Sequence, residues 1–169
     1  PVQARDLVSG AMLANIARAA AERACVRELE TGEAGIGRTD VLDAIAEELS
    51  WQMGRPLRFA PSEVRGTLER ARHMIAIAPA ALADIDVGPK AGFHRFLRRE
   101  PLGVVFTVAA WNYPYLIAVN SVVPALMAGD VVILKHSAQT PLCAERFEEC
   151  LREAGLPEGA FQALHLSHA

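Results

Sequence analysis

The segment from residue 103 to residue 134 predicts the centre of the fold, and it reads GVVFTVAAWNYPYLIAVNSVVPALMAGDVVIL. Residues 103–109 are a continuous β-rich run, which is typical of a strand covered on both faces in a parallel sheet. Residues 113–128 predict a helix, with a proline in the first turn and a glycine directly after the last residue. Residues 131–134 predict a second buried strand.

The pattern continues toward the C-terminus. Thr140 is expected to cap another helix, with Pro141 in its first turn, and a third strand is expected from Phe161 to Leu166. Strand, helix, strand, helix and strand joined by short connections predict an α/β fold, the first half of a Rossmann-like parallel sheet. A sheet that stopped at this third strand would expose an unpaired edge. We therefore expect the 169 residues to be the front part of a longer protein.

Toward the N-terminus the sequence is mostly helical, and residues 1–89 are expected to form a helical part that precedes the sheet. Apolar residues at three- and four-residue steps predict a first helix, followed by a loop over 31–39 and a second helix capped by Asp40. The apolar stripe of the first helix is Leu13, Ile16, Ala17, Ala20 and Ala24. A third helix is expected from Ser62 to Pro79. Residues 90–100 are expected to hold an exposed edge strand, and 101–169 the sheet.

Composition excludes several classes of protein. The net charge is −3 over 169 residues, which gives no large positive field, so a nucleic-acid partner is not expected. Three cysteines form no metal-ligand or disulfide pattern, and no basic-then-apolar leader is visible, so we expect a cytoplasmic protein without a metal site. Residues 101–129 contain no charged residue or histidine, which leaves a membrane span as an alternative. Asn112 and Pro114 within this run favour a buried strand, a turn and a helix instead.

Candidate functional residues follow the first two strands. Ligands of open parallel sheets bind at the carboxyl ends of the strands, where residues 109–115 and 135–141 are expected. Asn112 carries a neutral carboxamide that can donate to a developing oxyanion, or alternatively bond its own turn. Lys135 can reach a phosphate or a ribose, or alternatively be a solvated lysine at a strand end. The glycine-rich dinucleotide motif GxGxxG is absent from the sequence.

Six ordered motifs resemble the NAD(P)-dependent aldehyde dehydrogenase superfamily: EPLGVV (100–105), WNYP (111–114), PALMAGD (124–130), ILKHS (133–137), TPL (140–142) and EAGLP (153–157). Upstream, QMGRP (52–56) is similar to a Gly-Lys-Pro turn of that family. The resemblance covers about residues 41–169, whereas residues 1–40 match poorly.

The resemblance implies a role for each matching residue. Asn112 corresponds to the oxyanion-hole asparagine, and Lys135 to the lysine at the adenosine ribose. The cofactor channel is expected to be lined by Val108, Ala109, Ala110 and Trp111, with Ser137 and Ala138 beside the ribose. Ala110 stands where the family usually has proline. Ala138 stands where NAD-preferring members often have glutamate, so the expected cofactor is NAD or NADP, with NADP favoured.

The same resemblance places the cysteine nucleophile and the activating glutamate downstream of residue 169. Cys143 and Cys150 lie on a predicted buried stripe, where thiols are usually inert. His136 is expected in a solvent-facing loop, with phosphate binding by the protonated ring as the alternative. The implied parent enzyme oxidises an aldehyde to a carboxylic acid and assembles as a dimer or tetramer, with 90–100 as its oligomerisation arm. The fragment alone is expected to be inactive. The alternative is a non-catalytic module for cofactor binding or subunit interaction.

Overall fold

The computed structural model describes the backbone of residues 4–166 and the side chains of residues 18–166. It divides into two compact units, residues 1–66 and 67–169. Each unit is considered separately below.

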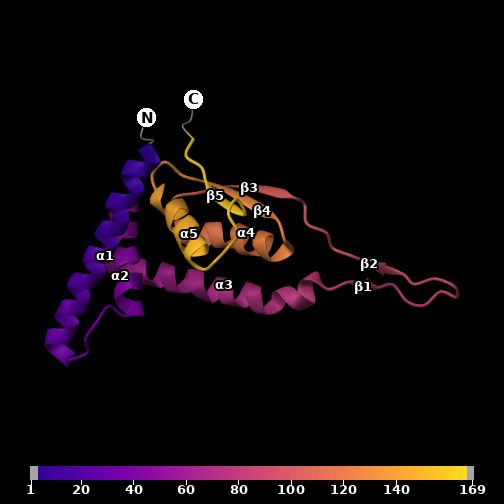
Figure 1. Ribbon diagram of the computed structural model, residues 1–169, viewed down its shortest axis with the longest axis horizontal. Helices are drawn as coiled ribbons and strands as arrows, with labels where there is room; N and C mark the ends of the chain where they lie inside the picture. Colours follow the sequence, from indigo (N-terminus) through magenta and orange to yellow (C-terminus); the bar gives the residue numbers. More distant parts are fainter. Residues whose placement is uncertain (1–3, 167–169) are drawn as a thin grey trace. The chain divides into compact units, whose positions relative to one another are not determined.

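The first unit is a helical hairpin followed by the start of a third helix. Helix α1 (Ala4–Thr31) packs against α2 (Arg38–Met53), and the 3-10 turn η1 (Leu57–Phe59) leads into α3 (Ala60–Leu82) (Figure 1). The buried apolar residues of these two helices are four alanines and one leucine: Ala20, Ala24, Ala44, Ala46 and Leu49. The side chains of Leu13, Ile16 and Ala17 in the predicted stripe lie outside the described residues.

The start of α2 differs from the prediction. Gly37 is the N-cap, and Asp40 is the third residue of the helix. The Asp40 carboxylate accepts the backbone N–H of Gly37 (2.6 Å) and an N–H of Arg27. Both bonds lower the pKa of Asp40, the Arg27 bond most strongly. Asp40 therefore stabilises the helix start from within the first turn.

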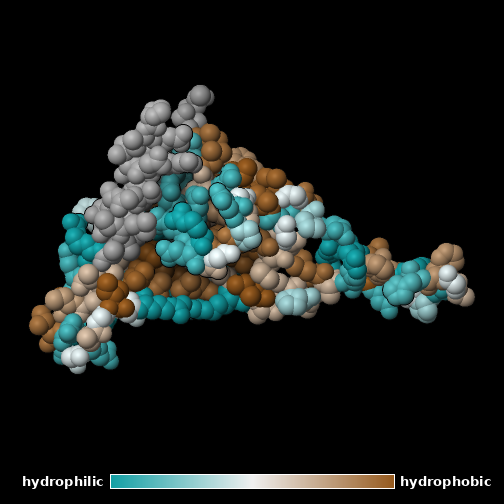
Figure 2. Space-filling model, in the orientation of Figure 1, coloured by the Kyte–Doolittle hydropathy of each residue, from teal (hydrophilic) through white to brown (hydrophobic). Residues whose placement is uncertain are grey.

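Helix α3 continues past Pro79, which was predicted to end it, and stops at Leu82. A proline this close to the C-terminus removes only one backbone hydrogen bond, so one further turn is retained. The exposed side chains of α3 include Arg65, Glu69 and Arg72. They form the solvated face that the sequence indicates, seen as the hydrophilic edge along this helix in Figure 2.

The second unit contains the predicted parallel sheet. Its strands are β3 (Val104–Ala109), β4 (Val131–His136) and β5 (Phe161–Ala163), in the order β3-β4-β5 and all parallel. Helix α4 (Pro114–Ala128) connects the first pair and α5 (Leu142–Glu153) the second (Figure 1). The α/β prediction is confirmed. Pro114 is at the first position of α4, and the left-handed Gly129 (φ 90°) ends it, as expected.

Both helices pack on one face of the sheet. The buried core consists of Ala109, Ala118, Val122, Ala125, Val132, Leu134, Ala144 and Phe161. The opposite face of β3 is exposed at Val104, Phe106 and Val108, so the prediction that both faces of this strand are covered is wrong for the described residues. Side chains alternate along a strand, and both crossover helices use the same face, so these three side chains of β3 point away from α4 and α5. Figure 2 shows hydrophobic atoms over this strand.

A small hairpin precedes the sheet. Strands β1 (Ile85–Asp86) and β2 (Phe96–Leu97) pair antiparallel, so the predicted strand over 93–99 forms only in part. The Arg98 guanidinium binds the Asp84 carboxylate with two hydrogen bonds (3.1 and 2.8 Å) and lowers the pKa of Asp84. In the part of the chain from 4 to 166, no helix is long and apolar enough to cross a membrane.

Candidate functional site

Two connections meet at one edge of the sheet. Val108 is the register partner of Lys135, and Ala109 is the partner of His136. The connection from β3 to α4 (residues 110–113) and the connection from β4 to α5 (residues 137–141) therefore begin side by side at the carboxyl ends of their strands. All eight predicted site residues lie on or next to this edge, as expected for a parallel sheet.

The first connection carries Asn112. The side chains of Asn112, Trp111 and Tyr113 are exposed, whereas Ala109 at the strand end is buried. Ala110 is exposed and continues the chain away from the strand. Asn112 precedes the N-terminus of α4 by two residues, where backbone N–H groups and the helix dipole favour negative charge. The structure therefore places a neutral donor on an open surface, at an electropositive helix end.

The structure contradicts the alternative that Lys135 is a solvated lysine at a strand end. Strand β4 extends two residues beyond the predicted end, so Lys135 is a strand residue, and only 6% of its surface is exposed. It shares its sheet face with Val108, opposite α4 and α5. Within the described part of the chain Lys135 forms no ion pair. The buried side chain is largely packed against protein, and its ammonium can donate to an anionic or hydroxyl-bearing ligand.

His136 was expected in a solvent-facing loop, and this prediction is wrong. The imidazole is 3% exposed at the end of β4. Its Nδ1 accepts the backbone N–H of Ser137 (3.0 Å) and the hydroxyl of Thr140 (2.9 Å). The other nitrogen, Nε2, then carries the proton and donates to the carbonyl oxygen of Pro114 (3.1 Å). Burial lowers the pKa of His136, and the nearby Lys135 charge lowers it further, whereas the hydrogen bond to Pro114 raises it. Because the lowering effects are larger, the ring is neutral near pH 7.

Thr140 does not cap α5 with its side chain as predicted. Its hydroxyl is committed to His136, and the helix starts at Leu142 after Pro141. In the same connection Ser137 is half-buried, and its hydroxyl accepts the N–H of Gln139 (3.3 Å). Ala138 is exposed. The second connection therefore offers a hydroxyl and an open, uncharged position beside Lys135.

The cysteines are divided between surface and core. Cys143 is completely buried in α5, as predicted, whereas Cys150 is exposed, so its assignment to the buried stripe is wrong. Cys25 in α1 is exposed. Among the described residues, no group of three or more His, Cys, Asp or Glu side chains is arranged to hold a metal ion.

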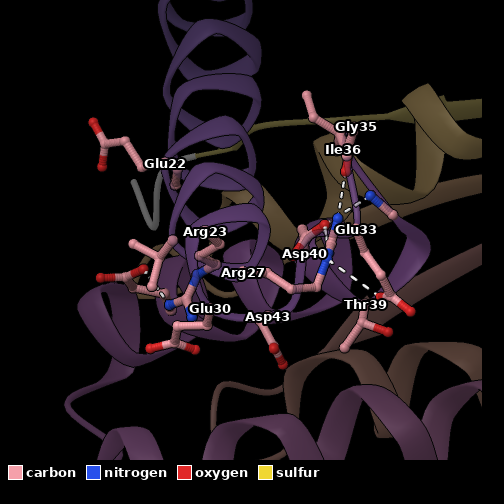
Figure 3. A pocket seen from close by; sticks show the side chains of 15 residues that line it. Glu22, Arg23, Arg27, Glu30, Glu33, Gly35, Ile36, Thr39, Asp40 and Asp43 are labelled. Carbon is pink, nitrogen blue, oxygen red and sulfur yellow. Dashed lines mark hydrogen bonds and ion pairs between the residues drawn. The ribbon is translucent and has the colours of Figure 1, made fainter.

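A separate hollow lies within the first unit. It has a volume of about 990 Å³, and its lining residues lie between positions 19 and 47. Arg27 bridges its wall by donating to the Asp40 carboxylate and to the Gly35 carbonyl, and it lies 3.9 Å from the Glu33 carboxylate (Figure 3). Arg23 pairs with Glu47 (2.8 Å) on the same wall. The arginines are thus engaged in joining α1 to α2, and none of the sequence-predicted site residues lies here.

The order of elements and the parallel strand order β3-β4-β5 define an α/β protein with part of a Rossmann-like sheet. A model described as the aldehyde dehydrogenase family matches residues 39–169, and the chain belongs to this family. A second model, described as the ARC AAA+ ATPase lid domain, matches residues 2–63 and overlaps the first model over residues 39–63.

Curated relatives and solved structures agree with this assignment. A succinate-semialdehyde dehydrogenase NADP(+) of Mycobacterium avium (strain 104) is 37% identical over 131 residues, 74% of this chain and 28% of the relative. One of Mycobacterium tuberculosis (strain ATCC 25618 / H37Rv) is 36% identical over 137 residues, 76% of this chain and 29% of the relative. The chain thus spans less than a third of their length.

Among the solved structures, PnpE in complex with nicotinamide adenine dinucleotide matches with a TM-score of 0.71 and 27% identity, over 94% of this chain and 32% of that chain. Succinic semialdehyde dehydrogenase from Streptococcus pyogenes in complex with NADP+ matches with a TM-score of 0.69 and 21% identity, over 99% of this chain and 37% of that chain. At that identity the match shows the fold alone.

Proposed function

We propose that this chain is the N-terminal, cofactor-binding portion of an NAD(P)-dependent enzyme that oxidises an aldehyde to a carboxylic acid. The observation that carries the proposal is the register of β3 on β4, which brings the Asn112 connection and the buried Lys135 to one edge. Residues 1–89, 90–100 and 101–169 are then the helical part, the oligomerisation arm and the first half of the cofactor sheet. Within this proposal the parent enzyme is a cytoplasmic homo-oligomer.

Asn112 has the role of an oxyanion donor. In the complete enzyme a cysteine thiolate adds to the aldehyde carbon, and the carbonyl oxygen becomes negatively charged. The Asn112 amide donates to that oxygen without competing for the proton, and the N-terminus of α4 adds favourable charge at the same place. A positioned donor of this kind is worth about 3 kcal/mol of transition-state stabilisation.

Lys135 and its neighbours have the role of holding the adenosine end of the cofactor, which supplies the hydride acceptor when bound. The residues present fit such a group, since Lys135 forms no ion pair within the described residues and can donate, and Ser137 offers a hydroxyl two residues later. The backbone of Val108, Ala109, Ala110 and Trp111 lines the channel. With no carboxylate at Ala138, nothing at that position repels a 2′-phosphate, which favours NADP. The curated relatives quoted above carry NADP(+) in their names.

The substrate is proposed from the same relatives. Their name makes succinate semialdehyde the first aldehyde to test, with NADP as cofactor. In the complete enzyme, aldehyde-dependent reduction of NADP is expected, and the 169-residue chain alone is expected to show none. Activity from the isolated chain would refute the assignment of nucleophile and base to positions beyond Ala169. A complete protein that binds NADP but oxidises no aldehyde would support the non-catalytic module instead.

Cofactor choice has its own test at Ala138. The Ala138→Glu variant is expected to raise KM for NADP by at least about fivefold, since two like charges about 4 Å apart repel by about 1 kcal/mol even in water. Ala138→Gln is the matched control, because it has the same shape without the charge. A strict preference of the unsubstituted enzyme for NAD would contradict this part of the proposal.

A further inference from the structure

We infer that His136 is the positioning residue that couples the Asn112 connection to the cofactor connection. This inference rests on the proposed function. It stands on one buried imidazole whose two nitrogens bond two different segments of the site. Sequence reasoning gave His136 no structural role.

One side of the ring faces the first connection. The Nε2–H group donates to the carbonyl oxygen of Pro114, the first residue of α4. Asn112 lies two residues before this point, and Ala109, the register partner of His136, lies immediately before the connection. The four residues 110–113 are therefore held at one end by the β-sheet and at the other by the imidazole. A short loop fixed at both ends has few conformations, which is what an oxyanion donor requires.

The other side of the ring faces the second connection. Nδ1 accepts the N–H of Ser137 and the hydroxyl of Thr140. These bonds fix the backbone where it leaves β4, directly after Lys135. Because both bonds end on one nitrogen, the turn from 137 to 140 is shaped around the ring. The position of Ser137 and Ala138 relative to Lys135 thus depends on Nδ1.

Two amide variants separate the two halves of the ring. In His136→Asn the side-chain oxygen can occupy the place of Nδ1 and accept from Ser137 and Thr140, but the side chain is too short to reach Pro114. In His136→Gln the side-chain NH₂ can occupy the place of Nε2 and donate to Pro114, but the acceptor for Ser137 is lost. Each variant therefore loses the hydrogen bonds of His136 to one connection and retains those to the other.

The experiment measures kcat with succinate semialdehyde and Kd for NADPH by fluorescence titration in the complete enzyme. His136→Asn is expected to lower kcat by at least about tenfold while Kd for NADPH stays within about twofold. His136→Gln is expected to raise Kd for NADPH by at least about fivefold with a smaller fall in kcat. Leu134→Val, in the buried core of the same strand, is the control for lost stability. The Leu134→Val variant should lower the midpoint of unfolding, and it should not change kcat and Kd for NADPH by different factors.

A merely structural histidine would give a different pattern. If each of the two His136 variants changes kcat and Kd for NADPH by similar factors, the inference is overturned, and the proposed function stands. If the unsubstituted enzyme neither binds NADPH nor oxidises the aldehyde, the proposed function fails and the inference fails with it. Nitrogen-15 NMR of the ring gives a readout independent of activity. The neutral Nε2–H form supports the inference, and the Nδ1–H form or a charged ring near pH 7 overturns it.

Discussion

Replacement of Asn112 by alanine is the most informative single change. The structure places this amide on an exposed connection beside the N-terminus of α4, so its loss leaves no gap in the core and the fold should be retained. The loss of one neutral oxyanion donor costs about 3 kcal/mol of transition-state stabilisation. At 1.36 kcal/mol for each factor of ten, kcat should fall by about 100- to 1000-fold.

The assay is steady-state oxidation of succinate semialdehyde by the complete enzyme, together with a direct NADPH titration. The affinity for NADPH should remain within about twofold, because Asn112 is assigned to the aldehyde oxygen and not to the adenosine end. Asn120→Ala is the matched control, since that exposed amide only donates to the Leu116 carbonyl within α4 (2.9 Å). If Asn112→Ala kept kcat within about threefold of the unsubstituted enzyme, the assignment of the oxyanion donor would be refuted.

Two further predictions concern β4. Lys135→Met should weaken NADP binding by about 10- to 150-fold, the loss of one charge-assisted hydrogen bond of about 1.5–3 kcal/mol; a direct NADPH titration that finds unchanged affinity would contradict the role assigned to this lysine. The pKa of His136 is lowered by burial, so the unfolded chain binds a proton at a higher pH than the folded protein does, and stability should decrease as pH falls below about 6.5. Chemical unfolding between pH 7 and pH 5 measures this slope, and His136→Asn should reduce it; equal slopes in the two proteins would be evidence against a buried neutral ring.

The centre of the fold was predictable because local signals agree there. A β-rich run, a proline at a helix start and a glycine at its end each specify the same elements over residues 103–134, and the structure confirms them. Which face of β3 is buried and which is exposed was not predictable in this way. Its sequence shows only that both faces are apolar, whereas the face that the crossover helices take depends on the three-dimensional path of the chain.

The positions of the candidate residues on the sheet were predictable, whereas their burial and hydrogen bonds were not. The rule that ligands lie at the carboxyl ends of parallel strands selected both connections, and the resemblance selected residues within them. The burial of Lys135 and His136 could not be predicted, because it depends on their pairing with Val108 and Ala109 and, for His136, on the position of the Pro114 carbonyl. A signal was present in Thr140, whose hydroxyl four residues after His136 is a suitable partner, but a capping role explained it equally well.

A structure of the complete enzyme with NADP bound tests the central claim most directly. The account predicts the Lys135 Nζ within hydrogen-bonding distance of the adenosine ribose or its 2′-phosphate, with the Asn112 amide directed at the space where the aldehyde oxygen sits. A cofactor bound away from the ends of β3 and β4, with Lys135 not touching it, would contradict the account.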